Sequence, residues 1–102
     1  MHYVITCRDH ADTTETRKTH LEAHLAHVRE ALARDDTLCL AGPIRDENAG
    51  IVGSLLIVKA DSAEAARLWL EQDPYHAAGI WQDIRIEPFK PAAGHWIGGA
   101  NW

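Results

Sequence analysis

The feature that most constrains the fold of this chain is an unbroken apolar run, Leu55 to Val58, within the stretch Ile51–Lys59. A strand with one solvent-exposed face alternates apolar and polar side chains, whereas successive apolar positions are typical of a strand in the middle of a sheet. We therefore expect Ile51–Lys59 to be a central strand that is buried on both faces. A fold built around such a strand needs neighbouring strands and cover on both sides of the sheet.

Three more strands are predicted along the chain. Residues 2–8 and 80–87 alternate apolar and polar side chains, and the second of these segments stops at Pro88. Residues 37–44 also have the character of a strand. Pro43 has no N–H to donate to a neighbouring strand, so this segment suits the edge of the sheet.

A long helix is predicted over residues 13–34. Asp12, followed by Glu15 at the third helical position, forms the pattern of a capping box. Apolar residues then recur at steps of four, three and four, which predicts one stripe that faces a core. The stripe consists of Leu21, Leu25, Val28 and Leu32.

A shorter helix is predicted after the cap signal at Asp61-Ser62 and runs to about residue 72. It ends before Pro74, because the residue that precedes a proline avoids helical geometry. The side chains expected to point inward are Ala65, Leu68 and Trp69.

The order strand, helix, strand, strand, helix, strand is that of the ferredoxin-like split β-α-β arrangement, an α+β fold with an antiparallel sheet and both helices on one face. Residues 2–8 and 51–59 carry apolar side chains on both faces. The face without helices is then either open to water at a large hydrophobic cost or covered by a second copy. We expect a homodimer. A tail over residues 91–102, with Trp96 and Trp102, is expected to be extended and to add to that contact.

The composition excludes several classes of partner. The formal net charge of -5 lacks the basic surface that phosphate binding requires, so we expect no nucleic acid. No stretch approaches the roughly 20 apolar residues of a membrane span. Cys7 and Cys39 lie far apart, which excludes a disulfide scaffold or a metal ribbon. We expect a cytoplasmic protein without a leader peptide and with one domain over residues 1–90.

Histidine is unusually frequent, with seven residues in 102, and His20, His24 and His27 share one arc of the long helix. These spacings would let a metal ion bridge two imidazoles, but no cysteine or HExxH pattern supplies further ligands. For His20 and His27 we therefore favour solvated surface side chains, and a metal site is the weaker alternative. His24 lies at the border of the apolar stripe. An imidazole there suits proton transfer at neutral pH, provided that a partner fixes its tautomer.

Asp73 is the natural candidate for that partner, although an Asp before Pro74 is also a common helix-terminating residue. Periodicity does not decide whether its carboxylate meets His24. Ser54 is a third candidate. No strand-turn-helix elbow surrounds it, so a nucleophilic triad is not favoured, and its small size after Gly53 would allow a close backbone approach.

Short stretches along residues 1–90 match a known family in order and spacing. They are Tyr3-Val4-Ile5, Arg17, Ala23-His24-Leu25-Ala26, Ala41-Gly42-Pro43, Gly53-Ser54-Leu55, Asp73-Pro74-Tyr75, Ala78-Gly79 and Ile86-Glu87-Pro88-Phe89. In these stretches the chain resembles the YciI-like (YCII-related domain) family.

The resemblance implies a ferredoxin-like protomer that pairs into a dimeric α+β barrel. It implies that the family's His–Asp pair maps onto His24 and Asp73, beside a pocket bordered by the Gly42-Pro43 turn and Ser54. Relatives include dehydrochlorinase-type enzymes that act on chlorinated hydroxyquinols, and the wider fold includes muconolactone isomerases and cofactor-free monooxygenases.

One departure from the family bears on substrate binding. Many members carry Arg-Pro where this chain has Leu21-Glu22. If that arginine holds an anionic substrate, the chain has lost the group or uses another one. Arg17 is the candidate replacement.

These observations predict a small enzyme of the lyase or isomerase type that needs no cofactor. Asp73 orients His24, which acts as general base or acid beside a carbonyl or phenol, and Tyr75 or Ser54 donates to a substrate oxygen. The substrate is a small organic molecule, aromatic or a lactone. Two alternatives remain: a binding domain that holds a small organic acid without turnover, and a metal-binding protein that uses His20, His24 and His27. A monooxygenase would rest on fold analogy alone.

Overall fold

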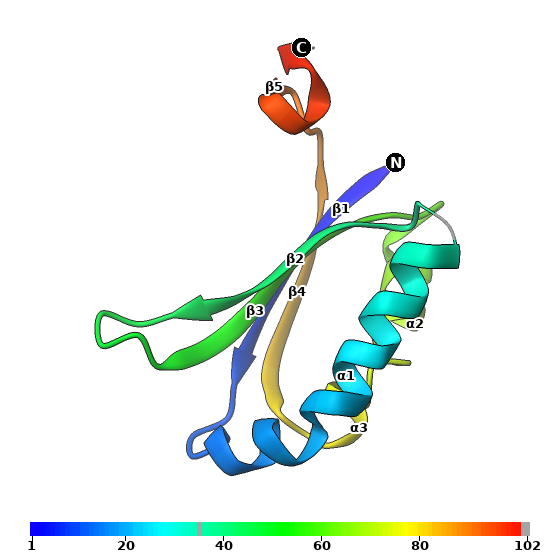
Figure 1. Ribbon diagram of the computed structural model, residues 1–102. Helices are drawn as coiled ribbons and strands as arrows, with labels where there is room; N and C mark the ends of the chain where they lie inside the picture. Colours follow the sequence, from blue (N-terminus) through cyan, green and yellow to red (C-terminus); the bar gives the residue numbers. More distant parts are fainter. Residues whose placement is uncertain (35, 101–102) are drawn as a thin grey trace.

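The structure, a computed structural model, describes residues 1–34 and 36–100. A four-stranded antiparallel sheet has the strand order β2-β3-β1-β4, and all the helices lie on one face of it (Figure 1). The fold is the predicted α+β arrangement with the order β-α-β-β-α-β. Its elements are β1 (His2–Asp9), α1 (Thr14–Arg34), β2 (Leu38–Arg45), β3 (Ile51–Lys59), α2 (Ala63–Leu70), α3 (Pro74–Ala77) and β4 (Trp81–Phe89).

The strand β3 lies in the middle of the sheet, between β2 and β1, as its apolar run predicts. Leu56 pairs with Ile5 on the face that carries the helices, and both side chains are buried. Ile57, on the opposite face, is 6% exposed. On that opposite face Leu55 is only half-buried and Lys59 is exposed, so within one chain the prediction of burial on both faces holds fully for the helix-bearing face and only in part for the other.

Both edges of the sheet carry a proline. Pro43 lies in the edge strand β2, as predicted. The prediction that the last strand stops at Pro88 is wrong, because β4 continues to Phe89 with Pro88 paired to Tyr3. An edge strand tolerates a residue without an N–H, since only one of its sides is bonded.

The helix α1 begins one residue later than expected, and the predicted cap is wrong. Asp12 has a φ of 59° and lies in a left-handed turn before the helix. Thr13 is the last residue before α1, and its hydroxyl donates to Oδ2 of Asp9 at 3.0 Å.

The predicted apolar stripe of α1 only partly meets a core. Leu21 and Leu32 are 41% and 58% exposed, whereas Arg17 and Ala31 are buried. Most of the stripe borders a cavity between α1 and the sheet, so α1 is inclined away from the strands instead of packing flat on them (Figure 1).

The helix α2 has the predicted cap, with the hydroxyl of Ser62 accepting from the Ala65 N–H at 3.0 Å. Its inward face is Ala66 and Leu70, both fully buried, whereas Leu68 is 56% exposed. The prediction that Leu68 points inward is therefore wrong. No helix in the described part of the chain has the length and apolar character needed to cross a membrane.

The tail is not simply extended. Ala93–Gly94 (β5) and Gly99–Ala100 (β6) form a two-stranded ribbon around the 3-10 turn His95–Ile97, which projects from the end of β4 (Figure 1). Trp96 and Trp102 were expected to add to a dimer contact. The side chain of Trp96 and all of Trp102 lie outside the described residues.

Candidate active site

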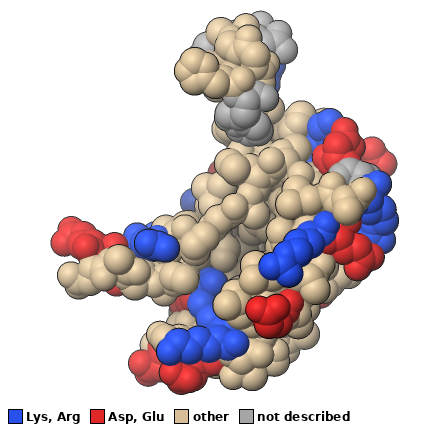
Figure 2. Space-filling model, in the orientation of Figure 1, with Lys and Arg blue, Asp and Glu red and all other residues tan. Residues whose placement is uncertain are grey.

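A cavity of about 310 Å³ opens between α1 and the helix-bearing face of the sheet. Charged side chains gather on the rim of this hollow, and its interior is mainly uncharged (Figure 2). Its size suits one small organic molecule. Aliphatic side chains line much of it: Leu21, Leu25 and Val28 from α1, with Ala41, Pro43 and Leu56 from the sheet.

His24 and Asp73, 49 positions apart in the sequence, meet at the wall of this cavity. Nδ1 of His24 lies 2.9 and 3.0 Å from the two carboxylate oxygens of Asp73. The side chain of Asp73 is 1% exposed and that of His24 is 20% exposed. A carboxylate that accepts from Nδ1–H fixes the tautomer in which Nε2 is free to take a proton.

The sequence around Asp73 explains its fixed position. Asp73 is the N-cap of α3, and its Oδ1 accepts from the Tyr75 N–H at 2.9 Å, while Pro74 occupies the first turn. Asp73 therefore binds the backbone, as the alternative prediction for this residue has it, but it begins α3 and does not end α2, which stops at Leu70. The short helix α3 is a separate element that was not predicted from the sequence.

Tyr75 holds the imidazole from its flat side. The rings of His24 and Tyr75 are stacked, with centroids 4.0 Å apart and an interplanar angle of 3°. The Tyr75 hydroxyl donates to the backbone oxygen of Arg17 at 3.3 Å, and burial raises the pKa of this phenol. The hydroxyl is thus engaged, and the stacked ring restricts the orientation of His24; the expected donation of Tyr75 to a substrate oxygen would require the hydroxyl to leave Arg17.

Arg17 enters the cavity with its charge already balanced. Its Nε and Nη2 donate to the two carboxylate oxygens of Asp9 at 2.7 and 2.9 Å, and the Asp9 side chain is 4% exposed. Burial would lower the pKa of Arg17, but the hydrogen bond and charge of Asp9 raise it above its usual value. Arg17 was expected to bind an anionic substrate in place of the family's Arg before Pro. Its positive charge is already balanced by Asp9, and this gives that expectation no support.

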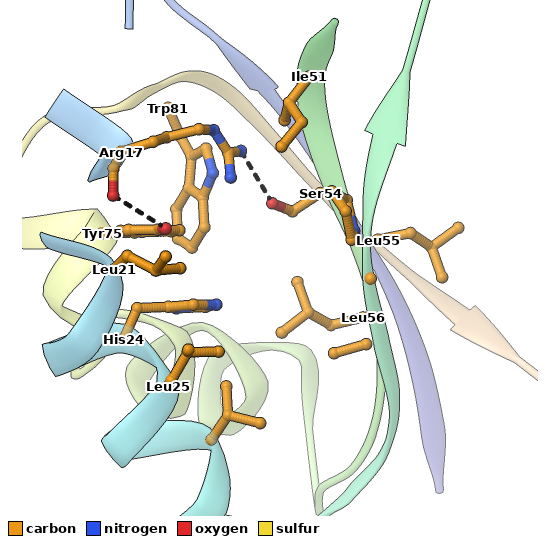
Figure 3. Close-up of a pocket in the computed structure, with 14 residues that line it drawn as sticks. Arg17, Leu21, His24, Leu25, Ile51, Ser54, Leu55, Leu56, Tyr75 and Trp81 are labelled. Carbon is orange, nitrogen blue, oxygen red and sulfur yellow. Dashed lines mark hydrogen bonds between the residues drawn. The ribbon is translucent and has the colours of Figure 1, made fainter. Parts of the chain in front are cut away.

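Ser54 also faces the cavity but is not set up as a nucleophile. Its Oγ accepts from Nη2 of Arg17 at 3.2 Å, and the residue is 8% exposed (Figure 3). It lies inside the strand β3, with no histidine among its hydrogen-bond partners in the described residues. Gly42 and Pro43 line the cavity as predicted.

The three histidines of α1 do not converge. The ring of His27 lies 5.5 Å from that of Trp69, whereas His24 turns to Asp73. Within residues 1–34 and 36–100, no three His, Cys, Asp or Glu side chains gather as metal ligands would. The structure gives the metal-binding alternative with His20, His24 and His27 no support, and His27 is half-buried rather than solvated.

Two residues of the site were not predicted from the sequence. Asp9 ends β1 and pairs with Arg17, eight residues later; an acid at a strand end before a helix with an inward arginine is the only signal for it. Trp81, at the start of β4, lines the cavity and meets Tyr75 edge-on, with centroids 6.3 Å apart. Its Nε1 is buried and has no hydrogen-bond partner in the described residues.

Comparisons with known proteins agree with the fold and the family. The YCII-related domain matches residues 1–90. Protein YciI of Escherichia coli and an uncharacterized protein of Haemophilus influenzae are each 41% identical over 96 residues, which is 88% of this chain and 97% of theirs.

A solved structure is also similar. It is the 5-chloro-2-hydroxyhydroquinone dehydrochlorinase TftG of Burkholderia phenoliruptrix, in complex with 2,5-dihydroxybenzoquinone. The two chains are 25% identical with a TM-score of 0.76, over 93% of this chain and 97% of that one. With the match over residues 1–90, these likenesses show that the chain belongs to the family of YCII-related domains.

Proposed function

We propose that this protein is a cofactor-independent enzyme of the lyase or isomerase type, in which His24 transfers a proton at a carbon next to a carbonyl or phenol. The observation that carries the proposal is the hydrogen bond from Nδ1 of His24 to buried Asp73, at the wall of a cavity. An acid–base pair held in one orientation in an apolar cavity is the arrangement that proton transfer to and from carbon requires.

The geometry supports the following steps. Nε2 of His24 takes a proton from the substrate carbon, and the electron pair of the broken C–H bond moves into the adjacent carbonyl to form an enolate. The imidazolium that results faces the carboxylate of Asp73, which stabilises its charge. In an isomerisation the proton returns to another carbon, and in an elimination the enolate re-forms the carbonyl as a leaving group departs.

The substrate class follows from the cavity and from the relative. A cavity of about 310 Å³ with aliphatic walls takes a single ring, aromatic or lactone, rather than a long chain. TftG is a dehydrochlorinase of a chlorinated hydroxyhydroquinone, and loss of chloride is an elimination of the kind described. Chlorinated hydroxyquinols are therefore the first substrates to test.

The test compares turnover by the purified protein with turnover by His24→Gln and Asp73→Asn. Chloride release from chlorinated hydroxyquinols, and ring-proton exchange in lactones, are measured. We expect both variants to lose about 10²- to 10⁴-fold in rate, the usual share of general acid–base catalysis. His20→Gln, on the same helix outside the cavity lining, is the matched control. Unchanged turnover in both variants would remove the pair from the mechanism, and saturable binding without turnover would favour the binding-domain alternative.

A homodimer is part of this proposal. Val4 and Leu55 lie on the sheet face opposite the helices, where no helix of the described chain covers them (Figure 1). On the same face Leu40 is 48% exposed. Apolar side chains on an uncovered sheet face often belong to an interface, and a second copy presents the same surface.

A further inference from the structure

One end of the cavity carries hydrogen-bond donors, and one of them, Nε1 of Trp81, is buried without an acceptor in the described residues. Figure 3 shows Arg17, Ser54 and Trp81 together at this end, which we name the donor end, with Leu21 and Leu25 towards the other. All three residues of the donor end are at least nine-tenths buried.

Two of the three have a donor to spare, and the third fixes their surroundings. Nε and Nη2 of Arg17 bind Asp9, Gly53 and Ser54, and Arg17 is also hydrogen-bonded to the side chain of Tyr75, so its guanidinium is occupied. Ser54 accepts from Arg17 with its oxygen, so its own hydrogen remains available. Nε1 of Trp81 is a donor only, and it is buried without a partner in residues 1–34 and 36–100.

A ligand group that fits this end must accept hydrogen bonds and need not donate any. A carbonyl or enolate oxygen meets that requirement. A hydroxyl group would arrive with a hydrogen that also needs an acceptor, and sites of this kind discriminate strongly between such groups.

The charges at the site favour a neutral acceptor in the ground state. Asp9 balances Arg17, and Asp73 adds a negative charge beside His24, so the site holds no surplus positive charge for a carboxylate. When His24 takes a proton from the substrate, the imidazolium and the enolate form together. Negative charge then develops where donors already lie, which is how an oxyanion is stabilised by a preorganised site.

We infer that Trp81 is a substrate-binding residue, whose Nε1–H, with the hydroxyl of Ser54, holds the substrate carbonyl oxygen and the enolate oxygen formed from it. The inference deepens the proposed function and rests on it for the identity of the reaction. It adds a subsite, and the class of group that the subsite takes, to a site otherwise defined by His24 and Asp73.

The first experiment uses 4-nitrophenol as a mimic of the enolate, at a pH below its pKa in water. In the bound state its O–H proton passes to Nε2 of His24, and the visible absorbance of the phenolate appears. Trp81→Phe keeps an aromatic ring against Tyr75 but removes the N–H. We expect this variant to lower the ratio of bound phenolate to bound phenol about tenfold, because one hydrogen bond to a charged oxygen is lost. Trp69→Phe, on α2 and outside the cavity lining, is the control and should match the wild type.

The second experiment observes the unaltered protein, so it does not depend on how the variant folds. In a ¹H–¹⁵N spectrum of the indole groups, the Trp81 signal is the one missing from Trp81→Phe. We expect 4-nitrophenolate to move this signal downfield, as a new hydrogen bond does, and to leave the Trp69 signal in place. An unmoved Trp81 signal, or a Trp81→Phe variant with the wild-type phenolate ratio, overturns the inference.

The two proposals fail separately. A protein that binds the phenolate through Trp81 but turns over none of the tested substrates contradicts the proposed reaction and supports the subsite. A protein whose turnover depends on His24, with no effect of Trp81→Phe on the bound phenolate, contradicts the subsite and leaves the reaction supported.

Discussion

The pair formed by Arg17 and Asp9 is the most consequential contact between single side chains in the site. Both side chains are at least nine-tenths buried, and two hydrogen bonds join them. A buried ion pair adds little net stability by itself, but removing one member leaves an uncompensated buried charge. The pair therefore acts mainly to hold one guanidinium in place.

We expect Arg17→Met to lower the free energy of unfolding by about 3–5 kcal/mol, because Asp9 is then buried without its counter-charge. The double variant Arg17→Met with Asp9→Asn should lose less than the sum of the single variants. Urea denaturation measures both. Lys18→Met is the control, since its pair with Glu15 is exposed and should be worth less than about 1 kcal/mol. Additive losses at Arg17 and Asp9 would contradict this account.

Cys7 gives the protein a pH dependence at alkaline pH. Burial raises the pKa of its thiol to about 12 from 9.0, and the carboxylates of Asp73 and Asp9 add to the shift. Above about pH 9 the thiol loses its proton in the unfolded chain but keeps it in the folded protein. The free energy of unfolding therefore falls as the pH rises towards 12, by about 1.4 kcal/mol per pH unit from this group. Urea denaturation between about pH 8 and 11 should show that the free energy of unfolding falls more steeply with pH for the wild type than for Cys7→Ala. Equal slopes for the two proteins would contradict a role of Cys7 in this pH dependence.

Among single residues, one half of the site could be predicted from the sequence better than the other. His24 and Asp73 were predicted from helix periodicity, from a proline and from family resemblance, and the structure brings them within 3.0 Å. Asp9 and Trp81 were not predicted. Their roles depend on long-range packing that places a strand end beside α1, and periodicity along a single element carries no information about that.

At the scale of elements, the close approach of β3 to β1 depends on Gly53. A Cβ at this position would lie 2.2 Å from the backbone oxygen of Cys7, too near for any side chain. We expect Gly53→Ala to lower the free energy of unfolding by about 2 kcal/mol or more, because backbone must move. Gly42→Ala, where a Cβ would meet nothing within 4 Å, is the matched control and should change stability by less than about 0.5 kcal/mol. Thermal denaturation distinguishes the two variants. Equal losses of stability in both would show that the close approach at Gly53 does not require a glycine.

Strands were predicted more reliably than helix faces, for a physical reason. A strand has only two faces, so alternation assigns its side chains directly, as for Ile5 and Leu56. A helix face depends on what packs against it. The stripe of α1 was expected to meet a core, but Leu21 borders a cavity, and in α2 the small residue Ala66 lies inward where Leu68 was expected.

At the scale of the whole molecule, the uncovered sheet face predicts the assembly. Light scattering after gel filtration should give twice the 11.3 kDa of the chain. Leu40→Lys places a charge on that face at a position already 48% exposed in one chain, so it should dissociate the dimer without unfolding the protomer. Leu32→Lys, 58% exposed on α1, is the control and should remain dimeric. A wild-type monomer at all concentrations would contradict the proposed dimer.

The parallel stack of Tyr75 on His24 has a stereochemical consequence. With one nitrogen bound to Asp73 and the ring plane fixed by Tyr75, the imidazole cannot rotate to present a different atom or approach from a different side. Under the proposed mechanism, the hydrogen that leaves one carbon and the hydrogen that returns to another both pass through this fixed nitrogen on one side of the substrate. We therefore expect an isomerisation by this imidazole to be suprafacial, with a deuterium label removed from one face of the ring delivered to that same face.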